Sequence, residues 1–311
     1  MTLQLGVNLP QLSRYDLVTD GTAFARAAEE IGYDSLWAYE RLLRPVDQSG
    51  VHGLYGVPDL PWPSDYAITS DPIVTLAAAA AVTDRIALGT GVLVPPLHVP
   101  VRLAKTLASL DAVSGGRLIA GLGSGWSVDE FAAVAPRPIQ ERGAALDEFL
   151  DIAAAVWGPD PVSYTSAHWP IAPSSIGPKP SRSLPVYLGG NGTKVFSRIA
   201  RSADGWLPTF VSPADFAAGM SRIRELAAEN GRDPAEISSI YQLPITDVTE
   251  VPSRDRQPFT GSLTQVLDDV VALAEAGVSH LYVSLPLAAT DLKELIELSE
   301  QWYAAVRGAG L

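Results

Sequence analysis

Short strand-like runs alternate with helix-like stretches along the whole of this chain, and no other feature limits its fold so strongly. A buried strand reads as an apolar run of about four to eight residues, whereas an amphipathic helix repeats apolar residues at i, i+3, i+4 and i+7. The first helical stretch shows this spacing at Phe24, Ala27, Ala28 and Ile31. The pattern predicts eight strands, at residues 3–8, 35–39, 85–92, 117–122, 185–189, 204–207, 237–242 and 279–284.

Eight strand–helix units in 311 residues predict an α/β fold of the (β/α)8 TIM-barrel type. The competing architecture is a doubly wound sheet, which normally carries a glycine-rich fingerprint after its first strand. Here residues 8–11 read Asn-Leu-Pro-Gln, without glycine, and no charged linker or low-complexity tract divides the chain. We therefore predict one barrel domain over residues 1–311, with extended loops on its C-terminal face.

Aspartate or serine precedes several of the expected helices, where a side-chain oxygen can cap the first turn. These residues are Asp71, Ser127, Ser212 and Ser262. Ser127 with Glu130, and Ser262 with Gln265, also match the capping box, in which two side chains bond each other's backbone N–H groups. We attribute Glu130 to this capping role rather than to chemistry.

Two stretches are too long and too rich in proline to be simple connections, residues 43–70 and 158–185. The first follows the second strand and therefore lies on the C-terminal face, where barrel active sites are found. We predict that it forms a lid whose aromatic residues Trp62 and Tyr66 contact a substrate. The alternative is an ordered surface excursion that packs its own aromatic side chains. Residues 158–185 are predicted to form a second, Pro-rich insertion.

The charge balance limits the ligands that this chain can bind. The chain has 22 basic and 35 acidic side chains, a net charge of −13, so we expect no nucleic-acid partner and no anionic membrane surface. A phosphorylated ligand would have to be met by a few local cations and backbone N–H groups. We expect a small-molecule substrate as the main partner.

The absence of cysteine excludes disulfides, thiolate catalysis and Cys-ligated metals. The four histidines are scattered, without metal-ligand spacing, so we expect no metal site; they are His52, His98, His168 and His280. We expect His280, inside a strand, to be an ordinary core residue. No signal peptide is visible, and the longest apolar stretch, residues 73–82, is far shorter than the roughly 20 residues of a spanning helix. These features favour a cytoplasmic protein.

One glycine-rich turn has the composition of a phosphate site. The six residues after the fifth strand are Gly189, Gly190, Asn191, Gly192, Thr193 and Lys194. Glycines there expose backbone N–H groups at a helix start, where the helix dipole favours an anion, and the lysine adds a positive charge. The alternative is a tight strand-to-helix turn. We favour the phosphate site because few helix starts combine so many glycines with a lysine.

Polar and aromatic side chains at other strand ends complete the candidate site. Glu40 and Arg41 end the second strand and are candidates for a proton carrier and an anion clamp; the alternative is that they pair with each other or with neighbours. Asp129 has no assigned structural role. Trp126, after the fourth strand, can wall a planar ring or contact a substrate, although core packing is the commoner use of such residues.

At this point the chain resembles the luciferase-like monooxygenase superfamily, in particular its coenzyme F420 (deazaflavin)-dependent oxidoreductases. The resemblance covers nearly the whole chain, and the order and spacing of its segments carry it. These segments are residues 31–40, 71–76, 83–92, 110–118, 121–126, 185–190 and 203–206.

The resemblance implies a flavin-type ring at the C-terminal mouth of the barrel. It implies that Thr90, Gly91 and Val92 lie against the ring, with a cis peptide bond between Gly91 and Val92. It also implies that Asp129 contacts the cofactor and that residues 189–194 hold its phosphate, in agreement with the composition of that turn.

Two departures from the resemblance bear on the reaction. Many relatives follow the acidic residue of strand two with histidine, whereas Arg41 follows Glu40 here. In sugar-phosphate dehydrogenase relatives a glutamate stands at the position of Trp126. We therefore do not expect a sugar phosphate, and we keep Glu40 and Arg41 as catalytic candidates that polarise or protonate the substrate.

Three functions remain open from the sequence. The first is an F420-dependent oxidoreductase that transfers a hydride between the deazaflavin and a small, rather apolar organic substrate. The second is an FMN-dependent two-component monooxygenase, which would need a reductase partner. The third is a non-catalytic flavin- or deazaflavin-binding protein. The oligomeric state is equally open, with a homodimer as one possibility.

Overall fold

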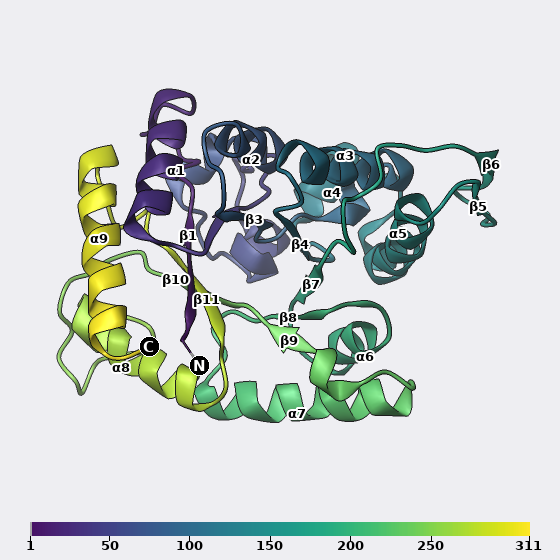
Figure 1. Cartoon of the computed structure of the whole chain (residues 1–311). Helices are drawn as coiled ribbons and strands as arrows, with labels where there is room; N and C mark the ends of the chain where they lie inside the picture. Colours follow the sequence, from purple (N-terminus) through teal and green to yellow (C-terminus); the bar gives the residue numbers. More distant parts are fainter. Residues whose placement is uncertain (1) are drawn as a thin grey trace.

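The computed structural model describes residues 2–311, and it shows a nearly closed barrel of parallel strands surrounded by helices (Figure 1). The predicted TIM-barrel fold is confirmed. The strands of the barrel are β1 (Gln4–Asn8), β2 (Ser35–Ala38), β3 (Ala87–Thr90), β4 (Leu118–Leu122), β7 (Val186–Gly189), β8 (Gly205–Leu207), β9 (Ser238–Ser239), β10 (Tyr241–Pro244) and β11 (His280–Ser284).

The strand order explains how the nine observed segments correspond to the eight predicted strands. Neighbours follow the order β10-β11-β1-β2-β3-β4-β7-β8-β9. β9 and β10 are two parts of the seventh predicted strand, interrupted at Ile240; β9 pairs with β8 and β10 pairs with β11. Because all these pairs are parallel, the carboxyl ends of the strands meet at one rim.

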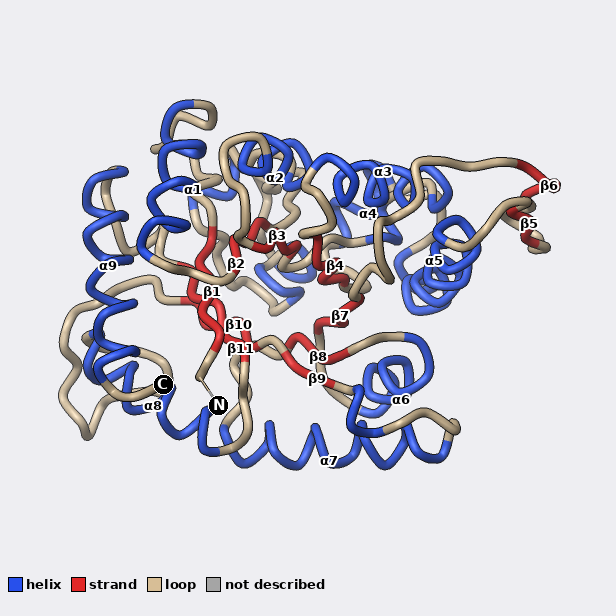
Figure 2. The backbone as a smooth tube through the Cα atoms, in the orientation of Figure 1, coloured by secondary structure: helices blue, strands red, loops and turns tan. Residues whose placement is uncertain are grey.

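The helices form an outer layer around the strands (Figure 2). They are α1 (Thr19–Ile31), α2 (Pro72–Ala80), α3 (Pro100–Val113), α4 (Val128–Val134), α5 (Arg142–Trp157), α6 (Thr193–Ser202), α7 (Pro213–Glu229), α8 (Leu263–Glu275) and α9 (Leu292–Gly308). Asp71 and Ser212 cap α2 and α7 through their side chains, as predicted. Within residues 2–311, no helix has the length and apolar character needed to span a bilayer.

Two stacked aromatic rings fill the interior of the barrel. Trp37 lies on Tyr282 with ring centroids 4.2 Å apart and an interplanar angle of 7°. A Cβ atom at Gly89 would overlap the Trp37 ring, and one at Gly91 would overlap the Tyr282 hydroxyl. The neighbouring strand β3 therefore carries glycine where these rings need space.

His280 is the first residue of β11, at the amino-terminal end of the barrel strands, and it is a buried core residue, as predicted. Its Nε2 lies 2.8 Å from Oγ of Ser35, which also accepts a 2.8 Å hydrogen bond from the indole N–H of Trp37. Burial lowers the pKa of His280 to about 4, since the charged imidazolium would lose its hydration. The side chain is therefore neutral at physiological pH.

The two Pro-rich stretches have different structures. Residues 43–70 follow β2 and form three short 3-10 helices, η1 (Gly50–His52), η2 (Leu54–Gly56) and η3 (Ser64–Ala67). Residues 158–185 connect α5 to β7 and contain an antiparallel hairpin, β5 (Val162–Tyr164) and β6 (Ile171–Ser174), that projects beside α5 at the edge of the molecule (Figure 1). The sequence pattern did not predict this hairpin.

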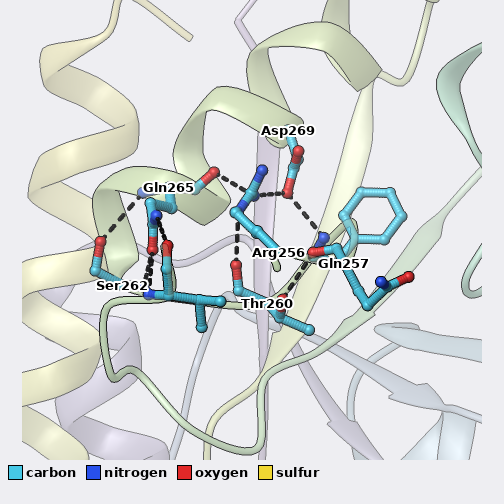
Figure 3. Close-up of polar contacts among 8 residues, drawn as sticks. Arg256, Gln257, Thr260, Ser262, Gln265 and Asp269 are labelled. Carbon is cyan, nitrogen blue, oxygen red and sulfur yellow. Dashed lines mark hydrogen bonds and ion pairs between the residues drawn. The ribbon is translucent and has the colours of Figure 1, made fainter. Parts of the chain in front are cut away.

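A polar network holds the loop between β10 and α8. Arg256 donates to the carbonyl oxygens of Thr260 and Gln265 and to the carboxylate of Asp269, which also accepts from the N–H of Phe259 (Figure 3). Ser262 and Gln265 form the predicted capping box at the start of α8. The amide of Gln265 also bonds both backbone groups of Val251, so one residue ties the helix start to the loop.

The capping box gives a stability prediction. Replacing Ser262 by alanine leaves an N–H of the first turn of α8 without its acceptor, and we expect the free energy of unfolding to fall by about 1 kcal/mol. Ser221→Ala, on the exposed surface of α7, is the matched control and should change it by less than about 0.5 kcal/mol. Urea unfolding measures both; equal effects would contradict the capping role.

The buried histidine gives a pH prediction. His280 binds a proton in the unfolded chain below about pH 6.5 but in the folded chain only below about pH 4, so folding stability must fall as the pH drops through this interval. The full contribution is roughly 3 kcal/mol. His280→Gln keeps a polar partner for Ser35 and should flatten this part of the stability–pH curve, whereas the exposed His168→Gln should not. If the stability of His280→Gln had the same slope against pH as the wild type, His280 would not be the cause of that pH dependence.

Candidate active site

A cavity of about 660 Å³ opens at the rim where the carboxyl ends of the strands meet. Its wall includes strand ends, the glycine-rich turns after β4 and β7, and side chains of residues 43–70. Leu54, Tyr55, Pro63 and Tyr66 come from this stretch, which therefore covers one side of the cavity. The position agrees with the lid predicted from the sequence.

Three glycines and one valine form the floor of the cavity, where β3, β4 and β7 end. Gly91, Val92, Gly123 and Gly189 all line it, and the peptide bond between Gly91 and Val92 is cis, as the family resemblance predicts. A Cβ atom at Gly123 would lie 2.8 Å from Cγ2 of Val92, and one at Gly189 would lie 3.1 Å from its Cγ1. The glycines therefore leave room for the Val92 side chain in this surface. Thr90 lies below it, fully buried, with its hydroxyl bonded to the carbonyl of Gly121 at 2.7 Å.

Glu40 is held rigidly in the cavity wall. The residue is 4% exposed; its Oε2 accepts a 2.6 Å hydrogen bond from the N–H of Val94, and its Oε1 lies 2.6 Å from Nε2 of His98. Burial opposes a charge on His98, but the hydrogen bond and the negative charge of Glu40, with a further contribution from Asp71, outweigh it and raise the pKa of His98.

Arg41 connects the lid to α4. Its guanidinium Nη1 donates to Glu130 Oε2 at 2.9 Å, and both side chains are nearly buried. Its Cζ also lies 4.8 Å from the ring centroid of Trp126, 5.1 Å from Trp62 and 5.7 Å from Tyr66. An arginine enclosed by aromatic rings and a carboxylate gains cation–π attraction as well as an ion pair.

The prediction that Glu130 completes a capping box is wrong. Ser127 does cap α4 by accepting from the N–H of Glu130, but the Glu130 carboxylate turns away to Arg41 and to the N–H of Leu42, at 2.9 Å each. The buried guanidinium of Arg41 and the N–H of Leu42, just before the lid, are stronger partners for this carboxylate than the backbone N–H of Ser127. Burial raises the pKa of Glu130, while Arg41 and the Leu42 N–H oppose this shift.

The predicted aromatic residues lie together, but they do not all reach the cavity. Trp126 and Tyr66 line it, as does Tyr55, whose ring lies 5.3 Å from that of Trp126. Trp62 is 3% exposed and packs behind Arg41 and against Trp126 at 4.9 Å, outside the cavity lining. Tyr55 stands in the predicted lid, and its place in the wall depends on tertiary packing that the sequence does not reveal.

Asp129 lies outside the cavity lining and joins the lid to α4. Its carboxylate oxygens lie 3.0 and 3.1 Å from Nδ1 of His52, in η1. The backbone carbonyl of His52 in turn accepts from the indole N–H of Trp62 at 2.8 Å. In this structure Asp129 therefore anchors the lid; the predicted contact with a cofactor stays a prediction.

The glycine-rich turn after β7 leads from the cavity to a helix start. Gly189 and Gly190 line the cavity, whereas Asn191, Gly192, Thr193 and Lys194 are exposed. Gly190 and Gly192 have φ values of 105° and 92°, which other residues rarely adopt. The first turn of α6 contains no acidic residue, so its N–H groups and Lys194 present a positive surface beside the cavity.

Besides Nε of Arg41, two buried oxygen atoms of residues that line the cavity have no hydrogen-bond partner among the described residues. They are Oδ1 of Asn8, at the end of β1, and Oγ1 of Thr209, just after β8. Buried polar atoms are normally satisfied, so these two are suited to a ligand with polar ring atoms. Sequence reasoning missed them, although both lie at the carboxyl ends of barrel strands, and this position was available as a signal.

Comparison with known proteins places the chain in a family. Residues 5–247 match the model of the family described as luciferase-like monooxygenase. The chain is 34% identical over 271 residues to the uncharacterized protein Rv0953c of Mycobacterium tuberculosis, covering 86% of this chain and 88% of that protein.

The chain belongs to the luciferase-like monooxygenase family. Another relative in sequence is the F420-dependent glucose-6-phosphate dehydrogenase of Amycolatopsis mediterranei, 29% identical over 193 residues, which cover 61% of this chain and only 53% of that enzyme.

Solved structures of low sequence identity share the family fold. An F420-dependent secondary alcohol dehydrogenase in complex with an F420-acetone adduct superposes with a TM-score of 0.78 at 18% identity, covering 99% of this chain and 100% of the other. A long-chain alkane monooxygenase superposes with a TM-score of 0.73 at 14% identity, covering 100% and 92%. The fold is therefore common to deazaflavin enzymes and monooxygenases.

The contact between His52 and Asp129 gives a prediction about the lid. Asp129→Asn removes the charged acceptor of His52, and we expect residues 43–70 to be cut several-fold faster in limited proteolysis, because transient opening of the lid becomes easier. Asp255→Asn, in an exposed loop after β10, is the control and should leave cleavage of this stretch unchanged. Equal cleavage rates in wild type and Asp129→Asn would show that the contact does not hold the lid.

Proposed function

We propose that this protein is a coenzyme F420-dependent oxidoreductase that transfers a hydride between the deazaflavin and a small, uncharged organic substrate. The observation that carries the proposal is the position of Glu40, a buried carboxylate fixed in the wall of a cavity that Gly91, Val92, Gly123 and Gly189 also line. Such a carboxylate can exchange a proton with a substrate oxygen while the redox chemistry is left to a cofactor.

The residues present fit a flavin-type cofactor. Gly91 and Gly123 place no side chain of their own in the cavity, which favours the approach of a planar ring to this part of the floor, beside Val92. The unpartnered oxygens of Asn8 and Thr209 are available to polar ring atoms. The turn beyond Gly190 offers its N–H groups and Lys194 to a phosphate, which the net charge of −13 would otherwise disfavour.

Each charged group has a distinct part in this proposal. When bound, the coenzyme supplies the acceptor or donor of the hydride. Glu40 takes or gives the proton of the substrate oxygen, and its orientation is set by the N–H of Val94 and by His98. The lid restricts the access of water to the cavity, which strengthens the interactions of the carboxylate.

The charges in the wall favour an uncharged substrate. Arg41 is already paired with Glu130 and enclosed by aromatic rings, and Glu40 is paired with His98. Arg41 is the only basic side chain in the described lining, and its charge is already balanced by Glu130, although its Nε has no hydrogen-bond partner. A sugar phosphate would therefore have to compete with Glu130 for this cation. The apolar side chains of Leu9, Leu54 and Leu287 suit a hydrocarbon body.

Cofactor titration tests the proposal. We would titrate the purified protein with F420 and with FMN separately, following fluorescence, and then measure F420 reduction with 2-propanol, 2-butanol and cyclohexanol. We expect F420 to bind more tightly than FMN. Tight FMN binding without F420 binding would overturn the proposal, and oxygen uptake with an FMN reductase present would then favour the two-component monooxygenase. Binding without turnover of any neutral substrate would favour a non-catalytic carrier.

Replacing the carboxylate separates chemistry from binding. Glu40→Gln keeps the size of the side chain, and we expect kcat/KM to fall by about 10²- to 10⁴-fold with an unchanged Kd for F420. Glu236→Gln, in η6 (Pro234–Glu236), is a control remote from the cavity. Undiminished turnover in Glu40→Gln would remove Glu40 from the reaction.

The phosphate site gives its own prediction. Lys194→Ala should weaken F420 binding by about tenfold, because one charge-assisted hydrogen bond is lost. The deazaflavin that lacks the phosphate-bearing tail should bind both proteins equally. Lys293→Ala, exposed on α9, is the control for the change in net charge. A similar loss of affinity for both ligands would place the phosphate elsewhere.

A further inference from the structure

The contact between Glu40 and His98 links the cavity to the outside of the barrel. Glu40 lines the cavity, whereas the His98 side chain is 28% exposed and lines a small surface groove between the segment before α3 and the region of α5. The two side chains lie 2.6 Å apart at Oε1 and Nε2. A group in contact with solvent therefore touches a carboxylate that is almost completely buried.

The arrangement of charges in the cavity wall shows why a cation beside Glu40 is favourable. Two carboxylates, Glu40 and Glu130, lie in the same wall. Burial is the main cause of the raised pKa of Glu130, and the negative charge of Glu40 raises it further. Arg41 is committed to Glu130 at 2.9 Å. Apart from His98, Glu40 has only the N–H of Val94 as a hydrogen-bond donor. His98 is therefore the one described partner of Glu40 that can carry a positive charge.

We propose that His98 is a positioning residue that holds Glu40 as an oriented carboxylate, and that it does so according to the pH of the solvent outside the cavity. The role in turnover rests on the proposed function, whereas the coupling between the two side chains is a property of the protein without a cofactor. The groups that face His98 are Glu40 and Asp71, with Arg137 and Glu148 in the shared groove.

The direction of the pH effect follows from this set of charges. The raised pKa of His98 means that the folded protein keeps the imidazolium to higher pH than the unfolded chain does. The stabilisation from the pair is therefore complete below about pH 6.5 and is lost as the pH rises through the pKa of His98 in the folded state. Glu40 keeps its charged partner only below that value.

Titration of the imidazoles by NMR tests the coupling directly in the cofactor-free protein. The chain has four histidines, so each signal can be assigned by replacing one histidine at a time with glutamine. We expect the pKa of His98 to lie above its usual value and to fall in Glu40→Gln. We expect a smaller fall in Asp71→Asn, which keeps a capping side chain on α2 and leaves the cavity unchanged. His168 is the internal control.

Turnover tests the positioning role. His98→Gln keeps an N–H donor of similar reach but cannot carry a charge. We expect its kcat/KM for cyclohexanol to fall by about tenfold to hundredfold and its pH profile to lose the limb that reports His98, with the Kd for F420 unchanged. His168→Gln should behave as wild type.

The two experiments fail independently. A pKa of His98 that is the same in wild type and Glu40→Gln would overturn the inference whatever the cofactor. An F420-dependent wild type whose pH profile is unaffected by His98→Gln would overturn the positioning role and leave the proposed function standing. A wild type that turns over no neutral alcohol with F420 would overturn the proposed function, and the NMR titration alone would then decide whether His98 and Glu40 are coupled.

Discussion

The stack of Trp37 on Tyr282 inside the barrel determines the shape of the site above it. The two rings, 4.2 Å apart, leave no space for a side chain at Gly89 or Gly91. Gly89 lies within β3, and Gly91 follows its end and lines the cavity together with Val92. Close packing of large side chains inside the barrel thus accounts for the glycine that stands at the base of the cavity.

The charged groups of the rim hold the lid in place and also set the charge of the cavity wall. Arg41 and Glu130 form a nearly buried ion pair, and such a pair stabilises a fold only when its remaining donors and acceptors are also satisfied. The N–H of Leu42 donates a hydrogen bond to Glu130, and aromatic rings surround the Arg41 guanidinium, so this requirement is met in part. The same contacts fasten the lid to α4, so closure of the cavity and neutralisation of its charges depend on each other. Glu40 is held separately, by His98 and by the N–H of Val94.

Patterns within a short stretch of sequence predicted the fold well. Apolar periodicity located the barrel strands, and the capping residues Asp71, Ser212 and Ser262 marked the starts of helices, because these signals act over one or two turns of the chain. The hairpin in residues 158–185 was missed because its strands are short and mostly exposed. Exposed strands lack the apolar run by which the others were found.

Contacts between distant parts of the chain were out of reach of the same reasoning. Glu40 and His98 are 58 residues apart, and Arg41 and Glu130 are 89 apart. Glu40 and Arg41 were selected because they end a strand at the rim, but their partners depend on how the barrel closes. Glu130 was assigned to a local cap for the same reason. Its neighbour Ser127 is only three residues away in the sequence, whereas its actual partner, Arg41, is brought to it by the fold.

The most direct test of the central claim is a crystal structure of the protein soaked with F420. We predict that the deazaflavin ring lies on the floor formed by Gly91, Val92 and Gly123, that the phosphate lies at the first turn of α6, and that Glu40 faces the remaining space. A ring bound elsewhere, or a phosphate far from Gly190 and Lys194, would contradict the claim that this rim is the site of a deazaflavin-dependent reaction.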